Sequence, residues 1–141
     1  MPKMKLAIKS IPAVLLLLSQ SAFAETHVVT AVGMKYEPMV VQIEPGDTVR
    51  WENMPTHNVE TVDGLVPEGT EKINSPMSEN YQHTFDKEGI YIYKCTPHIG
   101  AGMGGAIIVG QPTNLDDIKA ADVTGGVARI VRKAISEAES M

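Results

Sequence analysis

The segment from residue 95 to residue 103, Cys-Thr-Pro-His-Ile-Gly-Ala-Gly-Met, constrains the fold of this chain more than any other part. It places a thiol, an imidazole and a thioether within nine residues. Strand-like runs flank it on both sides, from Ile90 to Lys94 and from Ala106 to Val109. Pro97 and the glycines favour a tight loop between them. The fold must therefore bring these three side chains together where two strands end.

A further nitrogen donor lies well upstream, at His57. The chain has one cysteine and four histidines, so few other uses compete for these residues. One soft thiolate, two imidazoles and a distant thioether are the ligand set of a blue-copper site. We assign Cys95 as the thiolate, one ring nitrogen each to His57 and His98, and the weak axial sulfur to Met103. One copper ion is the predicted cofactor.

The start of the chain has the three parts of a secretory signal peptide. A lysine-bearing start precedes an apolar run from Ile11 to Leu18, and a small-residue cleavage site follows at Ala22-Phe23-Ala24. The run is far shorter than the roughly 18–20 residues that span a bilayer, so we expect no membrane span in the mature chain. The sequence predicts a signal peptide over residues 1–24, cleavage after Ala24 and a periplasmic protein.

Charge and cysteine content exclude several classes. The chain carries 17 acidic and 12 basic residues, and nucleic-acid binding would call for a basic stripe instead. A single cysteine cannot form an internal disulfide, although exported proteins commonly contain them. A metal that occupies this thiol is the better interpretation. Residues 25–141 are long enough for one compact domain, which we expect to be monomeric.

Short strand patterns separated by turns predict an all-β antiparallel sandwich of seven or eight strands. Besides the two runs that flank the loop, the predicted strands are His27 to Val32, Val40 to Ile43, Thr48 to Glu52 and Tyr81 to Phe85. Asp86-Lys87-Glu88-Gly89 is expected to form a hairpin-like connection.

The pattern becomes helical near the end of the chain. Asn114 is a predicted N-cap for a helix from Leu115 to Ala121, and Gly125-Gly126 is expected to interrupt it. Apolar residues then recur at helical spacing between Val127 and Ala138. We expect this helical extension, residues 114–139, to pack on its own domain.

The chain resembles a cupredoxin, and most closely a pseudoazurin. The matching segments are Pro45-Gly46-Asp47-Thr48-Val49, His57-Asn58-Val59-Glu60, Pro67-Glu68-Gly69, Glu79-Asn80-Tyr81, Lys94-Cys95-Thr96-Pro97-His98 and Gly102-Met103. The resemblance implies an eight-stranded Greek-key sandwich with two C-terminal helices and with copper near one end. It covers most of the predicted mature domain, residues 25–141.

The resemblance also implies roles around the ligands. His98 would be the partly exposed ligand through which electrons pass. Asn58 would hydrogen-bond to Thr96 and join the two ligand segments. Pro97 lacks an amide N–H and would leave the sulfur of Cys95 with one donor fewer.

The resemblance implies a blue-copper protein that shuttles single electrons between redox partners and catalyses no reaction on a substrate. The expected partners are a copper nitrite reductase, a nitrous oxide reductase or a c-type cytochrome. Two alternatives stay open, an amicyanin-like acceptor from an amine dehydrogenase and a copper carrier without redox turnover. The predicted docking residues are Ile99, Ala101, Lys35, Lys72 and Lys94.

Other polar residues receive structural interpretations. His27 and His83 lie on strand patterns with no ligand partner nearby in sequence. Glu60 is predicted to belong to a solvated acidic face with three other glutamates, Glu52, Glu68 and Glu71.

Overall fold

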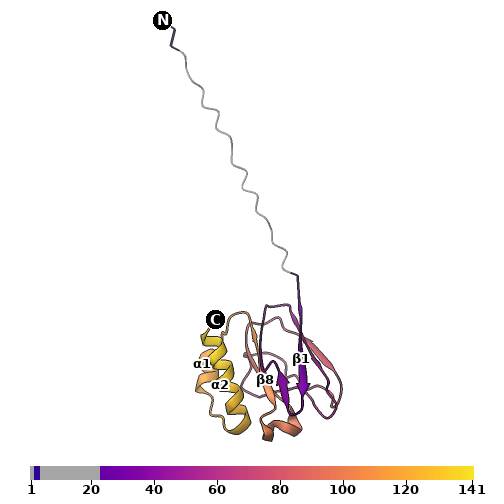
Figure 1. Cartoon of the computed structure of the whole chain (residues 1–141). Helices are drawn as coiled ribbons and strands as arrows, with labels where there is room; N and C mark the ends of the chain where they lie inside the picture. The colour runs from indigo at the N-terminus through magenta and orange to yellow at the C-terminus, as the bar shows by residue number, and fades with distance from the viewer. Residues whose placement is uncertain (1, 4–22) are drawn as a thin grey trace.

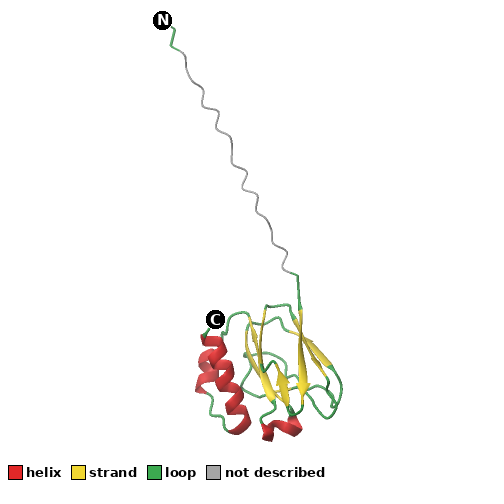
Figure 2. Cartoon of the chain, viewed as in Figure 1, coloured by secondary structure: helices red, strands yellow, loops and turns green. Residues whose placement is uncertain are grey.

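The computed structural model of this chain describes residues 2–3 and 23–141. The predicted signal peptide, residues 1–24, lies almost entirely outside the described residues. From Thr26 onward the chain forms two four-stranded sheets that face each other, followed by helices (Figures 1 and 2). The predicted fold class, an all-β eight-stranded Greek-key sandwich with two C-terminal helices, is confirmed.

The first sheet has the strand order β2-β1-β4-β6 and the second the order β3-β8-β7-β5. The first comprises β1 (Thr26–Val32), β2 (Lys35–Glu37), β4 (Thr48–Glu52) and β6 (Tyr81–Thr84). The second comprises β3 (Val40–Ile43), β5 (Glu60–Thr61), β7 (Gly89–Lys94) and β8 (Gly104–Val109). Two pairs are parallel, β1 with β4 and β3 with β8, so both sheets are mixed. The prediction of a purely antiparallel sandwich was wrong in this respect.

The connection after Phe85 is not a hairpin. β6 pairs with β4 in the first sheet, whereas β7 pairs with β8 and β5 in the second, so the chain crosses between the sheets here. The amide of Phe85 donates to the Asp47 carbonyl, which ends the ladder at the crossing. The predicted hairpin was wrong because a turn signal shows where a strand stops, and the partner of the next strand depends on distant segments.

β7 and β8 are buried on both faces because each face meets a separate apolar core. Successive side chains of a strand point to opposite sides. Tyr93 and Ile107 therefore enter the core between the sheets, while Ile92 and Ile108 face a second core under the helices. The result is a three-layer arrangement in which the helices cover one sheet (Figure 1).

The helical tail supplies the outer layer of that second core. It comprises α1 (Leu115–Ala120) and α2 (Gly125–Glu139), and the buried side chains of α2 are Ile130, Val131, Ala134 and Ala138. The prediction that this stripe packs on its own domain is confirmed. Every helix within residues 2–3 and 23–141 is too short or too polar to cross a membrane.

Two details of the tail differ from the prediction. Asn114 precedes α1, but its side chain makes no capping hydrogen bond. Its Nδ2 instead donates to the Ile90 carbonyl at 2.9 Å, and its Oδ1 accepts from the Ile90 amide at 2.7 Å, so it fixes β7 to the tail. Gly125 and Gly126 begin α2 and do not merely separate the two helices.

Candidate metal centre

The ligand loop starts where β7 ends and is closed by backbone hydrogen bonds. The amide of Cys95 donates to the Met103 carbonyl at 3.0 Å, and the amide of Met103 donates to the His98 carbonyl at 3.2 Å. A 3-10 helix, η1 (Thr96–Ala101), fills the interval. Gly102 ends it with φ 83°, a left-handed conformation that a residue without Cβ adopts without strain. The loop therefore returns to the neighbouring strand β8 only a few residues after it leaves β7.

A second segment brings His57 to the same place. The amide of His57 donates to the Met54 carbonyl at 2.9 Å, and its own carbonyl accepts from the Ser78 amide at 2.9 Å. Ser78 Oγ also accepts from the Thr56 amide. His57 is consequently held on both sides of its backbone, with its side chain buried and its ring turned toward the loop.

Three predicted ligand atoms form a small triangle. His57 Nδ1 lies 3.1 Å from His98 Nδ1, and Cys95 Sγ lies 3.6 Å from the first nitrogen and 3.4 Å from the second. A first-row metal binds nitrogen at about 2.0–2.1 Å and thiolate at about 2.3 Å, which separates neighbouring ligand atoms by roughly 3–4 Å. One ion fits between these three atoms.

Met103, the predicted axial ligand, is fully buried and belongs to the same apolar cluster as Cys95. Its backbone is part of the closed loop described above. A thioether shielded from water would be a weak sulfur donor for such a site.

Asn58 ties the two segments together, as the resemblance predicts. Its Nδ2 donates to Thr96 Oγ1 at 2.9 Å, and its Oδ1 accepts from the Thr96 amide at 2.7 Å. Its backbone carbonyl accepts from Tyr36 Oη at 2.6 Å. Pro97 lies in the first turn of η1, where it supplies no amide donor.

Glu60 is the residue that the sequence analysis missed. Thr96 Oγ1 donates to its Oε2 at 2.5 Å, and this hydrogen bond, helped by Lys72 and Lys94, lowers the pKa of Glu60. Its side chain is only 17% exposed, so it does not belong to a solvated face. Glu60 lies directly across from Lys94 in the β5–β7 pair. The opposite charges were visible in the sequence, but the pairing of these strands was not.

Burial sets the protonation of the groups around the triangle. It lowers the pKa of His57, and the neighbouring His98 lowers it further. The imidazole is therefore neutral near pH 7, which is the form that binds metals. Burial also raises the pKa of Tyr36, with a contribution from Cys95, so its hydroxyl stays protonated and donates to Asn58.

The predicted docking residues lie partly on the surface around His98. His98 and Ile99 are half-buried, and Ala101 is exposed. The three lysines all have carboxylate partners: Lys35 lies 3.1 Å from Glu37, Lys72 lies 3.3 Å from Glu60 and from Asp63, and Lys94 lies 4.0 Å from Glu60. These pairs reduce the positive charge that the lysines present to a partner.

Comparisons with known proteins agree with this geometry. The family model for copper-binding proteins of the plastocyanin/azurin family matches residues 24–110. A putative pseudoazurin from Rhizobium leguminosarum bv. viciae is 47% identical over 68% of this chain, and the match spans 64% of that protein, just under two thirds of its length. The pseudoazurin of Paracoccus pantotrophus is 42% identical over 77% of this chain and 81% of its own.

Solved structures give the same result. The crystal structure of native pseudoazurin from Hyphomicrobium denitrificans superposes with a TM-score of 0.71 at 32% identity. The match covers 79% of this chain and 97% of that one.

Proposed function

This chain is a blue-copper protein of the plastocyanin/azurin family, most like the pseudoazurins, and we propose that it shuttles single electrons between redox proteins of the periplasm. Its ligands are Cys95 as thiolate, His57 and His98 through Nδ1, and Met103 as the weak axial sulfur. Residues 1–24 are removed after Ala24, and residues 25–141 form the single copper-binding domain.

The triangle of Cys95 Sγ, His57 Nδ1 and His98 Nδ1 is the observation that carries this proposal. The bound copper supplies the one-electron Cu(I)/Cu(II) couple, and a trigonal set with a weak axial bond lies between the preferences of its two states. The chain's contribution is to keep the ligands in place. Loop closure at Met103 and the Asn58–Thr96 hydrogen bonds hold both ligand segments, so little rearrangement accompanies each transfer.

Electrons pass through the exposed edge of His98. The side chains around it are small or apolar, with Pro97 and Ala101 exposed and Ile99 half-buried, which suits a small, short-lived interface. We assign this chain no enzymatic reaction on a substrate.

The partners we propose are a copper nitrite reductase or nitrous oxide reductase on one side and a c-type cytochrome on the other. The proposal includes electrostatic attraction of the partner by Lys35, Lys72 and Lys94. The carboxylates beside each lysine weaken this attraction. Lys94→Ala should slow electron exchange with the true partner at low salt, and Lys119→Ala, on the helical tail, is the matched control. Equal rates for Lys94→Ala and the unsubstituted protein would rule out steering by Lys94.

The decisive experiment is a visible absorption spectrum of the Cu(II)-loaded protein, before and after ascorbate. We expect an intense thiolate-to-copper band that disappears on reduction and is absent from Cys95→Ala. His83→Ala, which removes a histidine outside the site, should keep the band. A protein that binds copper but lacks the band would contradict the electron-carrier function. The alternative function, a copper carrier without redox turnover, would then be favoured. Mass spectrometry of the protein recovered from a periplasmic fraction tests the location and the cleavage after Ala24.

A further inference from the structure

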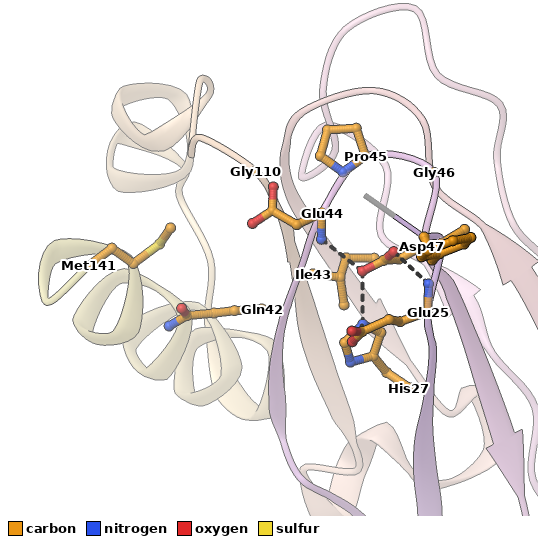
Figure 3. A pocket seen from close by; sticks show the side chains of 12 residues that line it. Glu25, His27, Gln42, Ile43, Glu44, Pro45, Gly46, Asp47, Gly110 and Met141 are labelled. Carbon is orange, nitrogen blue, oxygen red and sulfur yellow. Dashed lines mark hydrogen bonds and ion pairs between the residues drawn. The ribbon is translucent and has the colours of Figure 1, made fainter. Parts of the chain in front are cut away.

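A second group of side chains with metal-ligating atoms close together lies at the end of the sandwich opposite to η1. β1 starts there, and the turn between β3 and β4 lies beside it (Figures 1 and 3). Glu25, His27 and Asp47 each offer a ligand atom, and these atoms lie within 4.8 Å of one another. The sequence analysis treated His27 as an ordinary strand residue because Asp47 is 20 residues away. Parallel pairing of β1 with β4 brings the two together.

The side chain of Asp47 is held in place by hydrogen bonds. Its side chain is 7% exposed, and its Oδ1 accepts from the Glu25 amide at 2.9 Å. Its Oδ2 accepts from the Glu44 amide at 3.0 Å and lies 2.9 Å from His27 Nε2 (Figure 3). The hydrogen bond from Glu25, followed by that from His27, lowers the pKa of Asp47 and keeps it ionised. A buried, ionised carboxylate beside an imidazole nitrogen offers one ion an oxygen and a nitrogen ligand at close range.

The remaining ligands lie on the solvent side. The carboxylate of Glu25 is 74% exposed, and its Oε2 lies 4.0 Å from His27 Nε2. His27 is 26% exposed, so its nitrogen can be reached from outside. An ion near His27 Nε2 would need only a rotation of the Glu25 side chain to gain a second carboxylate.

Removal of residues 1–24 would add a fourth ligand. The nitrogen of Glu25 that now lies 2.9 Å from Asp47 Oδ1 is a peptide amide, and peptide amides do not bind metals without losing a proton. In a chain that begins at Glu25 the same atom is a primary amine, which binds metals when neutral. Phe23 and Ala24 also line the pocket beside the group, which has a volume of about 710 Å³, and cleavage would remove them from its wall.

We propose that the mature chain holds a second divalent-metal site, formed by the amino group and carboxylate of Glu25, His27 Nε2 and the carboxylate of Asp47. Two nitrogens and two carboxylates suit Zn²⁺ or Cu²⁺. The amine ligand rests on the proposed cleavage after Ala24. The site is distinct from the blue-copper ligands and joins the amino terminus to the turn before β4, so an ion bound here stabilises the folded domain by mass action.

The test is calorimetric titration of Zn²⁺ into copper-loaded protein that begins at Glu25. We expect one Zn²⁺ per chain. Affinity should fall at least about tenfold in His27→Gln and in Glu25→Ala, which removes the carboxylate and keeps the amino group. A chain that retains Ala24 should also bind more weakly, because its Glu25 nitrogen stays an amide. His83→Gln is the matched histidine control and should bind as the unsubstituted protein does.

Absence of Zn²⁺ binding would overturn the proposal, and so would binding that His27→Gln leaves unchanged. Equal affinity with and without Ala24 would exclude the amine as a ligand. The blue absorption band is recorded in the same samples before Zn²⁺ is added, because Zn²⁺ that displaced the copper would also remove the band. Its absence with Zn²⁺ binding intact would refute the electron-carrier function alone, and its presence without Zn²⁺ binding would refute only the second site.

Discussion

The side-chain amide of Asn58 and the backbone and hydroxyl of Thr96 form a reciprocal pair, with one donated and one accepted hydrogen bond at 2.9 and 2.7 Å. Asn58 follows His57 and Thr96 follows Cys95, so this pair joins the segments that carry two of the proposed ligands. Thr96 also donates a hydrogen bond to Glu60, and Glu60 forms ion pairs with Lys72 and Lys94. The loop and the β5 segment are thereby linked independently of any metal.

Asn58→Ala should destabilise the metal-free protein by about 1–3 kcal/mol, because both part-buried hydrogen bonds between Asn58 and Thr96 are lost. Urea unfolding measures this change. Thr96→Val keeps the amide bond to Asn58 but removes the two hydrogen bonds of the hydroxyl, with Asn58 and with Glu60, so its cost should be similar. An unchanged free energy of unfolding in Asn58→Ala would contradict this prediction.

Gly126→Ala should disturb the ligand loop from the helical tail. A Cβ at this position would collide with the Ile99 carbonyl oxygen and would lie 2.9 Å from the Gly102 Cα. We expect a loss of about 1–3 kcal/mol and a shifted thiolate-to-copper band, although no proposed ligand is altered. Gly100→Ala, in the loop itself, meets no atom within 4 Å and should leave the spectrum unchanged. An unshifted band in Gly126→Ala would contradict this coupling.

Met103→Leu should change the reduction potential of the copper with little effect on the stability of the fold. The volume is nearly conserved, so we expect less than about 1.5 kcal/mol of destabilisation. The reduction potential should rise, because the thioether donates electron density that favours Cu(II) over Cu(I). Voltammetry of the copper-loaded protein measures the shift. Met54→Leu, at another fully buried methionine, should leave the potential unchanged. An unchanged potential in Met103→Leu would exclude the axial role.

His83 should make stability depend on pH. Burial lowers its pKa below the usual value, although the charges of Asp86 and Glu71 act in the opposite direction. Between the folded pKa and the unfolded value of about 6.5, the unfolded chain binds more protons. The free energy of unfolding is therefore highest above about pH 6.5, and it decreases as the pH falls from there toward the pKa of His83 in the folded chain.

His83→Gln should flatten this part of the curve. Urea unfolding of the metal-free protein from pH 5 to pH 8 compares the two chains, and His57 contributes equally to both. If the difference between the two unfolding free energies is the same at pH 5 and pH 8, His83 does not titrate on folding.

Local patterns predicted the elements well and their partners poorly. The strand Val40–Ile43 has the bounds predicted from its β-branched run, and Thr48–Glu52 those predicted from alternation. Which strands pair was not readable, because pairing depends on segments that lie far apart in the chain. This explains the wrong hairpin after Phe85 and the unexpected parallel pairs.

The same limit applies to side chains. The spacing within residues 95–103 is local and predicted the loop that the structure contains. Glu60 was misjudged, and the side-chain partners of Asn114 and His27 were not predicted, because Thr96, Ile90 and Asp47 come from other strands or loops. Their neighbours in the sequence gave no sign of these contacts.

The two-sided burial of β7 and β8 has a consequence for how copper is retained. Amide protons in such strands exchange with solvent only when the whole domain opens, whereas edge strands and turns exchange through small local openings. Cys95 directly follows β7 and Met103 directly precedes β8, so we expect the loop to be anchored in the strands whose amides exchange most slowly. Transient opening at β2 or at the turn before it leaves that anchor intact.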